Sequence, residues 1–209
     1  MHRLKVLGLA MLALVAVSAV ASASASAALP EYSATATLSG TSGVSTLTTV
    51  GSSTTIVCKK DKFTGTTTGS SKASTFKVTF EECEAGGAKC KTGETAGIIT
   101  SEGTGTLGYI SKEAKTVGVS LAPKEVVITC GVLKAKVKGT FICAVTPVNT
   151  STTSFKQKCE VSSKGVQKIS KFEGGSAQSL EATFSTTFEQ AALETEEAIT
   201  ASVAGEIKA

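Results

Sequence analysis

The sequence predicts an all-β protein, an antiparallel β-sandwich or a barrel-like architecture stapled by disulfides. Apolar residues alternate with Ser, Thr and Lys at a period of two through most of the chain, which is the pattern of half-buried strands. Gly-containing breaks separate these short runs, as turns do in sandwiches and barrels. Six cysteines supply up to three bridges. One domain or two closely packed halves would both suit this pattern.

Four segments show the alternation most clearly. The residues expected to face inward are, in chain order, Phe76, Val78 and Phe80; Leu133, Ala135 and Val137; Leu180, Ala182, Phe184 and Phe188; and Ile199, Ala201, Val203 and Ile207. The Thr-rich segment 32–50 is expected to form strands, because β-branched side chains suit a pleated surface. Only 188–198 could form a helix, and its ALETEE stretch fits an exposed acidic hairpin loop equally well.

Residues 1–27 are expected to be a secretory signal peptide. Basic residues precede an apolar run from Val6 to Val20, and Ala25-Ser26-Ala27 supplies the small residues that precede a cleavage site. We therefore expect one secreted domain over 28–209, released or held loosely on the cell envelope. No later run approaches the roughly 18 apolar residues of a membrane-spanning helix.

The expected mature chain lacks residues on which many functional sites depend. His2 and Arg3 are the only His and Arg, both lie in the leader, and Trp is absent. Of the 21 basic residues, Arg3 and Lys5 belong to the leader, which leaves 19 Lys against 17 acidic residues. A nearly neutral chain without Arg is a poor candidate for nucleic-acid recognition. Without His, nucleophile activation by Ser-His-Asp or Cys-His arrangements is also excluded.

The cysteines are interpreted as structural, although six cysteines allow many connectivities. The pairs proposed from their spacing are Cys83 with Cys90, Cys143 with Cys159, and Cys58 with Cys130. The first pair flanks a tight turn. The second lies symmetrically about residue 151 and would sit directly opposite in a hairpin centred there. The third is what remains, and it would close a loop of roughly 70 residues, worth on the order of 4 kcal/mol in the chain-entropy model.

No metal or cofactor site is predicted. Zinc sites usually need C-x-x-C pairs or His, and neither occurs in the expected mature chain. Residues 103–108 match G-x-G-x-x-G, but a dinucleotide site needs a helix that opens at the third Gly, and the following residues alternate as a strand. We expect Gly103 and Gly105 to let a neighbouring strand approach closely instead.

Two arrangements could still carry hydrolytic chemistry. Ser74 and Lys77 form S-x-x-K, which needs a helix to bring both side chains to one face, whereas a strand is expected there. Two carboxylates suffice for a glycosidase. The acidic clusters are Glu81, Glu82 and Glu84, and Glu194, Glu196 and Glu197. Both clusters are expected to be solvated turn charges, and few aromatic residues are available to stack on sugars.

Three lysines are expected to project from one face of a strand at about 7 Å spacing, namely Lys134, Lys136 and Lys138. They could contact an anionic cell-wall polymer or polysaccharide. The interpretation that we favour is an edge strand whose lysines prevent sheet-to-sheet pairing.

Several segments run in order through most of the expected mature chain: IVCKKDKFTG, VTFEECEAGGAKC, TGTLGYI followed by KTVGVSLAP, VTPVNTSTTSF, GVQKISKFEGG and FEQAALETEEAITASVAGEIKA. Together they resemble a family of exported, cysteine-containing proteins that is expanded in soil actinobacteria and has no established activity. The resemblance implies a secreted β-rich protein whose family cysteines correspond to Cys58, Cys83, Cys90 and Cys130. Cys143 and Cys159 are then extras, and two extras together suit a bridge between them.

From these observations we expect an extracellular protein with a non-catalytic role in binding, adhesion or envelope structure, without a cofactor. The alternative is a secreted glycan-active hydrolase that uses a Glu pair. An enzyme should gather two or more Glu with displaced pKa values in one cleft, whereas a binder should present a flat or grooved patch. A secreted inhibitor is a third hypothesis, with no residue in its favour.

Overall fold

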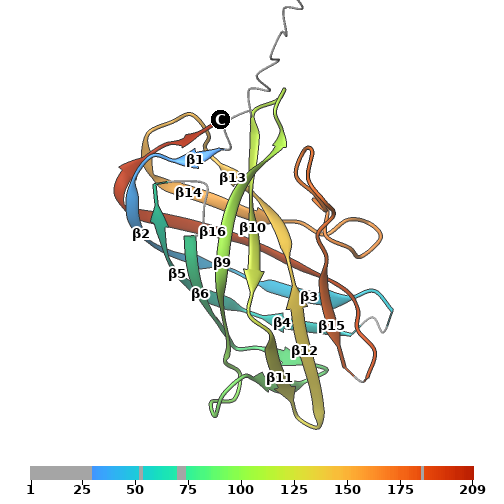
Figure 1. The fold of residues 1–209 in the computed structure, drawn as a ribbon. Coiled ribbons are helices and arrows are strands. Elements are labelled where there is room, and N and C mark those ends of the chain that lie inside the picture. The colour runs from blue at the N-terminus through green and yellow to red at the C-terminus, as the bar shows by residue number, and fades with distance from the viewer. Residues whose placement is uncertain (1–29, 52–53, 70–73, 185) are drawn as a thin grey trace, which may run out of the picture.

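The computed structural model describes residues 30–51, 54–69, 74–184 and 186–209, and this part of the chain is all β, with no helix (Figure 1). The predicted signal peptide lies outside the described residues. The strands are β1 (Glu31–Tyr32), β2 (Thr35–Ser42), β3 (Ser45–Thr49), β4 (Thr55–Cys58), β5 (Lys60–Thr68), β6 (Ser74–Glu81), β7 (Glu84–Ala85), β8 (Ala88–Lys91), β9 (Ile99–Ser111), β10 (Thr116–Pro123), β11 (Val126–Cys130), β12 (Leu133–Gly139), β13 (Phe141–Thr146), β14 (Thr152–Cys159), β15 (Leu180–Thr183), β16 (Glu189–Gly205) and β17 (Ile207–Lys208). The predicted fold class is confirmed.

Antiparallel strands close into a barrel in the order β14-β13-β10-β9-β6-β5-β2-β16, because β16 also pairs with β14. Closure leaves these strands without a free edge, which removes the usual template for aggregation. Between the two architectures that the sequence left open, the structure therefore has the barrel.

A second set of strands shares β16 with the barrel. Residues 189–194 of β16 pair with β15 and β3, whereas 195–205 pair with β14 and β2. From β16 the second sheet runs through β15, β12, β11, β8, β7, β4 and β3, and β3 pairs with β16 again. In Figure 1, β9 and β10 rise to the top of the barrel, while β11 and β12 form the bottom of the molecule. The long strand β16 thus couples the two parts.

Most of the residues predicted to face inward are buried or packed against the core. Three are not: Leu133 is 42% exposed, Val203 is 51% exposed, and Phe188 is half-buried outside the core, with Lys138 over its ring. Leu133 begins β12 directly after a turn. Val203 lies where the pairing of β14 with β16 shifts register, between Ser154↔Thr200 and Thr152↔Gly205. A register shift of this kind breaks the alternation of faces, which explains the second exception.

The segment for which a helix or an acidic loop was considered belongs to β16 from residue 189 onward, so both interpretations are wrong. Thr195, Glu197, Ile199 and Ala201 are buried along this stretch, and the residues between them are exposed. This is the period of a strand with one face in the core.

All six cysteines form disulfides: Cys58–Cys83, Cys90–Cys130 and Cys143–Cys159. The third pair is confirmed. It joins β13 to β14 across the predicted centre of symmetry, with Cα atoms 4.3 Å apart. The other two predicted pairs are wrong. Since every cysteine is oxidised, none is available to bind a metal.

Four of the cysteines lie in one row, with Cys58 on β4, Cys83 directly before β7, Cys90 on β8 and Cys130 on β11, so each inner cysteine has two cysteine neighbours. Cys83 and Cys90 do face each other across the β7–β8 turn, and the Cys90 N–H donates to the Cys83 carbonyl at 2.9 Å. The other backbone groups of these two cysteines bond to Gly97, because the Cys83 N–H donates to the Gly97 carbonyl and the Cys90 carbonyl accepts from the Gly97 N–H, each at 2.9 Å. Each cysteine bonds outward instead, to Cys58 or Cys130, over a Cα separation of 4.0 Å.

Candidate functional site

The glycine-rich segment 103–109 lies within β9, and no helix follows it. A Cβ on Gly103 would collide with the backbone of Ala122 on β10, and one on Gly105 would lie 2.6 Å from the Ser74 Oγ. The prediction of a close strand approach is confirmed. Ser74 and Lys77 lie on β6, where Ser74 donates to the Gly105 carbonyl and Lys77 is exposed on the other face, so the structure does not bring them together.

The first acidic cluster is a set of ion pairs at the surface, in which Glu81 is half-buried. Glu81 accepts a hydrogen bond from Lys62 at 2.7 Å, which lowers the pKa of this carboxyl. Glu82 pairs with Lys59 at 3.1 Å, and Glu84 pairs with a lysine across the β7–β8 turn. Carboxylates held ionised by lysines are poorly suited to act as general acids. This cluster gives the hydrolase hypothesis no support.

The second acidic cluster divides between the two faces of β16. Glu194 and Glu196 are exposed, as predicted for solvated charges. Glu197 is 3% exposed and points into the core, so the prediction of a solvated turn charge is wrong for this residue.

The three predicted lysines lie on the outer face of β12, whereas Ala135 and Val137 point inward. This strand pairs with β11 on one side and, through residues 136–139, with β15 on the other, so the edge-strand interpretation is wrong along most of its length. Lys138 lies 3.7 Å from a Glu181 carboxylate oxygen and 3.9 Å from the centre of the Phe188 ring. Lys134 and Lys136 are exposed and form no ion pair among the described residues.

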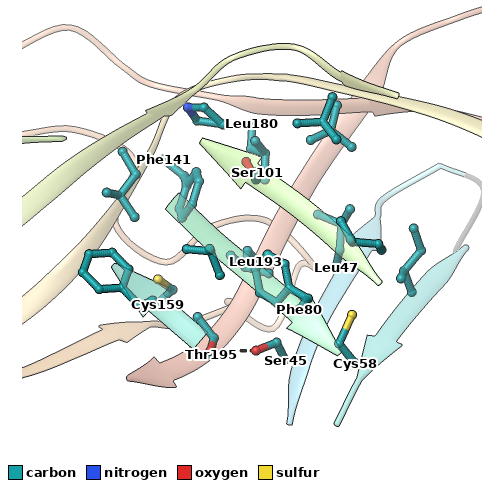
Figure 2. A pocket seen from close by; sticks show the side chains of 18 of the residues that line it. Ser45, Leu47, Cys58, Phe80, Ser101, Phe141, Cys159, Leu180, Leu193 and Thr195 are labelled. Atoms are coloured by element: carbon teal, nitrogen blue, oxygen red, sulfur yellow. Dashed lines mark hydrogen bonds between the residues drawn. The ribbon is translucent and has the colours of Figure 1, made fainter. Parts of the chain in front are cut away.

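Two cavities of about 90 Å³ each lie inside the molecule. We call the first the junction cavity, because both sheets line it: Leu47, Ile56, Ile128 and Leu193 come from the second sheet, and Phe76 and Phe141 from the barrel. The second lies within the barrel. Phe63, Phe76, Leu121 and Gln157 line both cavities, which therefore adjoin. Figure 2 shows side chains from several strands around the junction cavity.

A polar network lies beside the apolar lining of the junction cavity. Asp61 is 2% exposed on β5 and accepts two hydrogen bonds from Ser42, one from the N–H at 2.9 Å and one from the hydroxyl at 2.6 Å. The hydroxyl of Ser45 donates to the same carboxylate at 3.4 Å and shares a hydrogen bond of 2.8 Å with Thr195, drawn in Figure 2. Burial raises the pKa of Asp61, and these hydrogen bonds oppose that rise.

Glu197 lines the junction cavity, and its carboxyl lacks hydrogen bonds like those that Asp61 accepts. Its Oε2 atom is buried without a hydrogen-bond partner among the described residues. Burial, together with the negative charge of Asp61, raises the pKa of Glu197 to about 8. The carboxyl of Glu197 is therefore protonated at neutral pH, while the hydrogen bonds from Ser42 and Ser45 favour the charge on Asp61.

Strand register places these groups in one row of inward-facing side chains. Gln157 on β14 is opposite Glu197, Glu197 is opposite Ser42, Ser42 is opposite Asp61, and Asp61 is opposite Phe80. Directly opposite residues in an antiparallel sheet point to the same side. A signal in the sequence could have found the row, because Glu197 shares the parity of Ile199 and Ala201, and Asp61 that of Phe63.

The residues around the junction cavity limit its chemistry. Among the described residues no Lys or Arg lines this cavity, so no basic side chain there neutralises an anion. Asp61 and Glu197, both with raised pKa values, are buried inside the closed sheets. A protonated carboxyl in an apolar wall can donate one hydrogen bond and accept another.

The fold and the site define a disulfide-linked, closed β-barrel with a mostly apolar cavity between the barrel and the second sheet. No protein-family model, curated protein or solved structure matches the chain. The resemblance to the actinobacterial family therefore stays a prediction, and function has to be argued from the site itself.

Proposed function

We propose that this chain is an exported, non-catalytic binding protein that holds a small, largely apolar molecule in its junction cavity. The observation that carries the proposal is the Glu197 carboxyl, which is 3% exposed, lines an apolar cavity and leaves Oε2 without a partner among the described residues. A buried polar group without a partner is destabilising by about 1–3 kcal/mol. A ligand hydroxyl or amine at this position would supply the missing hydrogen bond.

The cavity limits the size and the charge of the ligand. One water, which has a single non-hydrogen atom, needs roughly 10–15 Å³ of cavity volume. The junction cavity of about 90 Å³ therefore has room for about six or more non-hydrogen atoms. The barrel cavity adjoins it and would extend the space for a longer apolar chain. A carboxylate ligand is disfavoured, because among the described residues no basic side chain lines the cavity, and the Asp61 carboxyl lies behind the lining, hydrogen-bonded to Ser45.

The test uses three probes with the same hydrocarbon chain: 1-hexanol, hexylamine and hexanoate at pH 6.5. We expect 1-hexanol to cause saturable NMR shifts in the methyl groups of Ile56, Ile128 and Leu193, which line the cavity. Hexylamine is an ammonium ion at this pH, so it should bind in the same place only by pairing with a Glu197 carboxyl that has given up its proton. Hexanoate should cause none of these shifts, because it is ionised at this pH.

Two variants separate binding at Glu197 from non-specific effects. Glu197→Leu should weaken 1-hexanol binding about 10-fold, the equivalent of one lost hydrogen bond. Glu196→Gln is the matched control, because its side chain is on the exposed face of the same strand. Absence of saturable shifts for all three probes, or equal binding of hexanoate and 1-hexanol, would contradict the proposal.

Export is the second part of the proposal. Three disulfides are compatible with an extracellular protein, and no helix of the described residues is long and apolar enough to cross a membrane. We propose that the segment 1–27 directs secretion and that the protein acts outside the cell or loosely on its envelope. A fusion of this segment to a reporter enzyme should deliver the enzyme to the medium, and retention inside the cell would contradict export.

A further inference from the structure

The β11–β12 hairpin concentrates exposed aliphatic side chains. Val132 in its turn is 99% exposed, and Val127 and Leu133 are 47% and 42% exposed. In the described part of the chain the other large apolar residues with comparable exposure are Val44, Val50 and Val203. Single exposed aliphatic residues are ordinary, but half of the set on one hairpin indicates a contact surface.

The turn end of this hairpin, which carries Val132 and Leu133 and which we call the tip, is held in a fixed position. Residues 126–130 pair with 133–137 in continuous register, so Val132 stands in a short turn between two full strands. Gly131 supplies the turn with a left-handed φ of 59°. Cys130 at the end of β11 is bonded to Cys90 on the neighbouring strand. Figure 1 shows this hairpin at the bottom of the molecule, far from the β9–β10 hairpin at the top.

Uncompensated positive charge lies beside the tip. Lys134 and Lys136 on the outer face of β12 stand opposite Thr129 and Val127. Neither lysine is in an ion pair among the described residues, in contrast to Lys138. On the other side of β11, Thr129 is opposite Lys91. The acidic residue nearest to β11 in the sequence is Glu125, which directly precedes the strand and lies at the end away from the turn.

We propose that the β11–β12 hairpin docks the protein on an anionic lipid bilayer, with Val132 and Leu133 entering the interfacial region and Lys134 and Lys136 contacting the phosphate headgroups. Lysines alone could bind any polyanion. An apolar tip flanked by lysines matches a bilayer better, because a bilayer has anionic headgroups and an apolar layer beneath them. The proposal is independent of the junction cavity, which lies inside the molecule.

The test is co-sedimentation of the protein at low salt with vesicles of phosphatidylcholine, alone or mixed with phosphatidylglycerol. Binding is expected only to the mixed vesicles. Lys134→Gln with Lys136→Gln should lower the partition coefficient about 25-fold, at roughly 1 kcal/mol for each lysine. Val132→Ser should lower it about 10-fold through lost apolar burial. Thermal melting checks that these exposed substitutions leave the fold intact.

Matched controls lie elsewhere on the surface. Val44→Ser removes an aliphatic residue that is 62% exposed, and Lys112→Gln with Lys115→Gln removes two lysines from the β9–β10 hairpin. Both controls should bind the mixed vesicles as the parent protein does. Failure of the parent to bind, or equal losses in controls and hairpin variants, overturns the proposal. The proposal is also overturned if the protein binds polygalacturonate but not the vesicles, and if that binding depends on the lysines but not on Val132. This result would indicate an anionic polymer as the partner.

Discussion

The free energy of unfolding should fall as pH rises from 5 to 8, and Glu197→Gln should remove most of that fall. In the folded protein the pKa of Glu197 is raised from 4.5 to about 8, with burial as the larger cause and the charge of Asp61 as the smaller. Between these values the folded protein keeps a proton that the unfolded chain has released. The folded state therefore loses stability relative to the unfolded state as pH increases.

The magnitude follows from the size of the shift. Within the window from 4.5 to about 8, stability should change by about 1.4 kcal/mol for each pH unit, which amounts to about 4 kcal/mol between pH 5 and pH 8. Below 4.5 both states are protonated, and above the folded pKa both are ionised, so the contribution of this group is flat outside the window. Asp61 acts in the same direction, because its pKa is raised as well.

Other titrating groups interfere little with this measurement. The lowered pKa values of ion-paired carboxyls such as Glu81 and Glu102 act below the window, where stability is lost as pH falls. The one His of the chain, His2, lies in the predicted leader. Urea unfolding of the mature protein, followed by circular dichroism at pH 5 and pH 8, measures the difference. The reasoning is refuted if the parent is equally stable at both values, or if Glu197→Gln shows the same decline as the parent.

Three further predictions concern the disulfides and the glycines. Peptide mapping without reduction should recover Cys58 joined to Cys83. Recovery of Cys83 joined to Cys90 would contradict this disulfide pairing. Replacing both cysteines of the 143–159 bridge by Ser should lower the free energy of unfolding by about 3 kcal/mol in urea titrations, given a separation of 16 residues. Gly103→Ala should destabilise by about 1–3 kcal/mol, because its Cβ meets the backbone of Ala122. The exposed neighbour Thr104 serves as its control, and Thr104→Ala should leave the melting temperature nearly unchanged.

The local pattern of the sequence was sufficient to predict most of the strands, although not the first half of β16, for which a helix or an acidic loop was considered. Alternation in segments such as 76–80 and 180–184 reports directly which side chains face the core, and that relation needs no knowledge of neighbouring strands. Barrel closure was not predictable in this way, because it depends on the pairing of β14 with β16, two strands whose register no local pattern contains. The same applies to the second sheet, which closes only because β16 is long enough to serve both.

The disulfides mark the same limit between local and non-local information. The bridge 143–159 was predictable because a hairpin fixes which residues are opposite from the position of its turn alone. The row formed by Cys58, Cys83, Cys90 and Cys130 joins two pairs across strands that are distant in sequence. Only the order β4-β7-β8-β11 shows that each inner cysteine also has an outer cysteine beside it.

Glu197 was missed for a different reason, since its inward position follows from the alternation that places Ile199 and Ala201 inside. The acidic composition of residues 194–197 predicts solvent exposure, whereas the alternation along the strand predicts that Glu197 faces the core. The physical consequence is a local conflict, in which a carboxyl occupies a core position and lowers stability across the neutral pH range. If Glu197→Gln proves more stable than the parent at pH 8, the carboxyl does not serve the fold. A polar group that weakens the fold where it faces a cavity is a local conflict of the kind expected at functional sites.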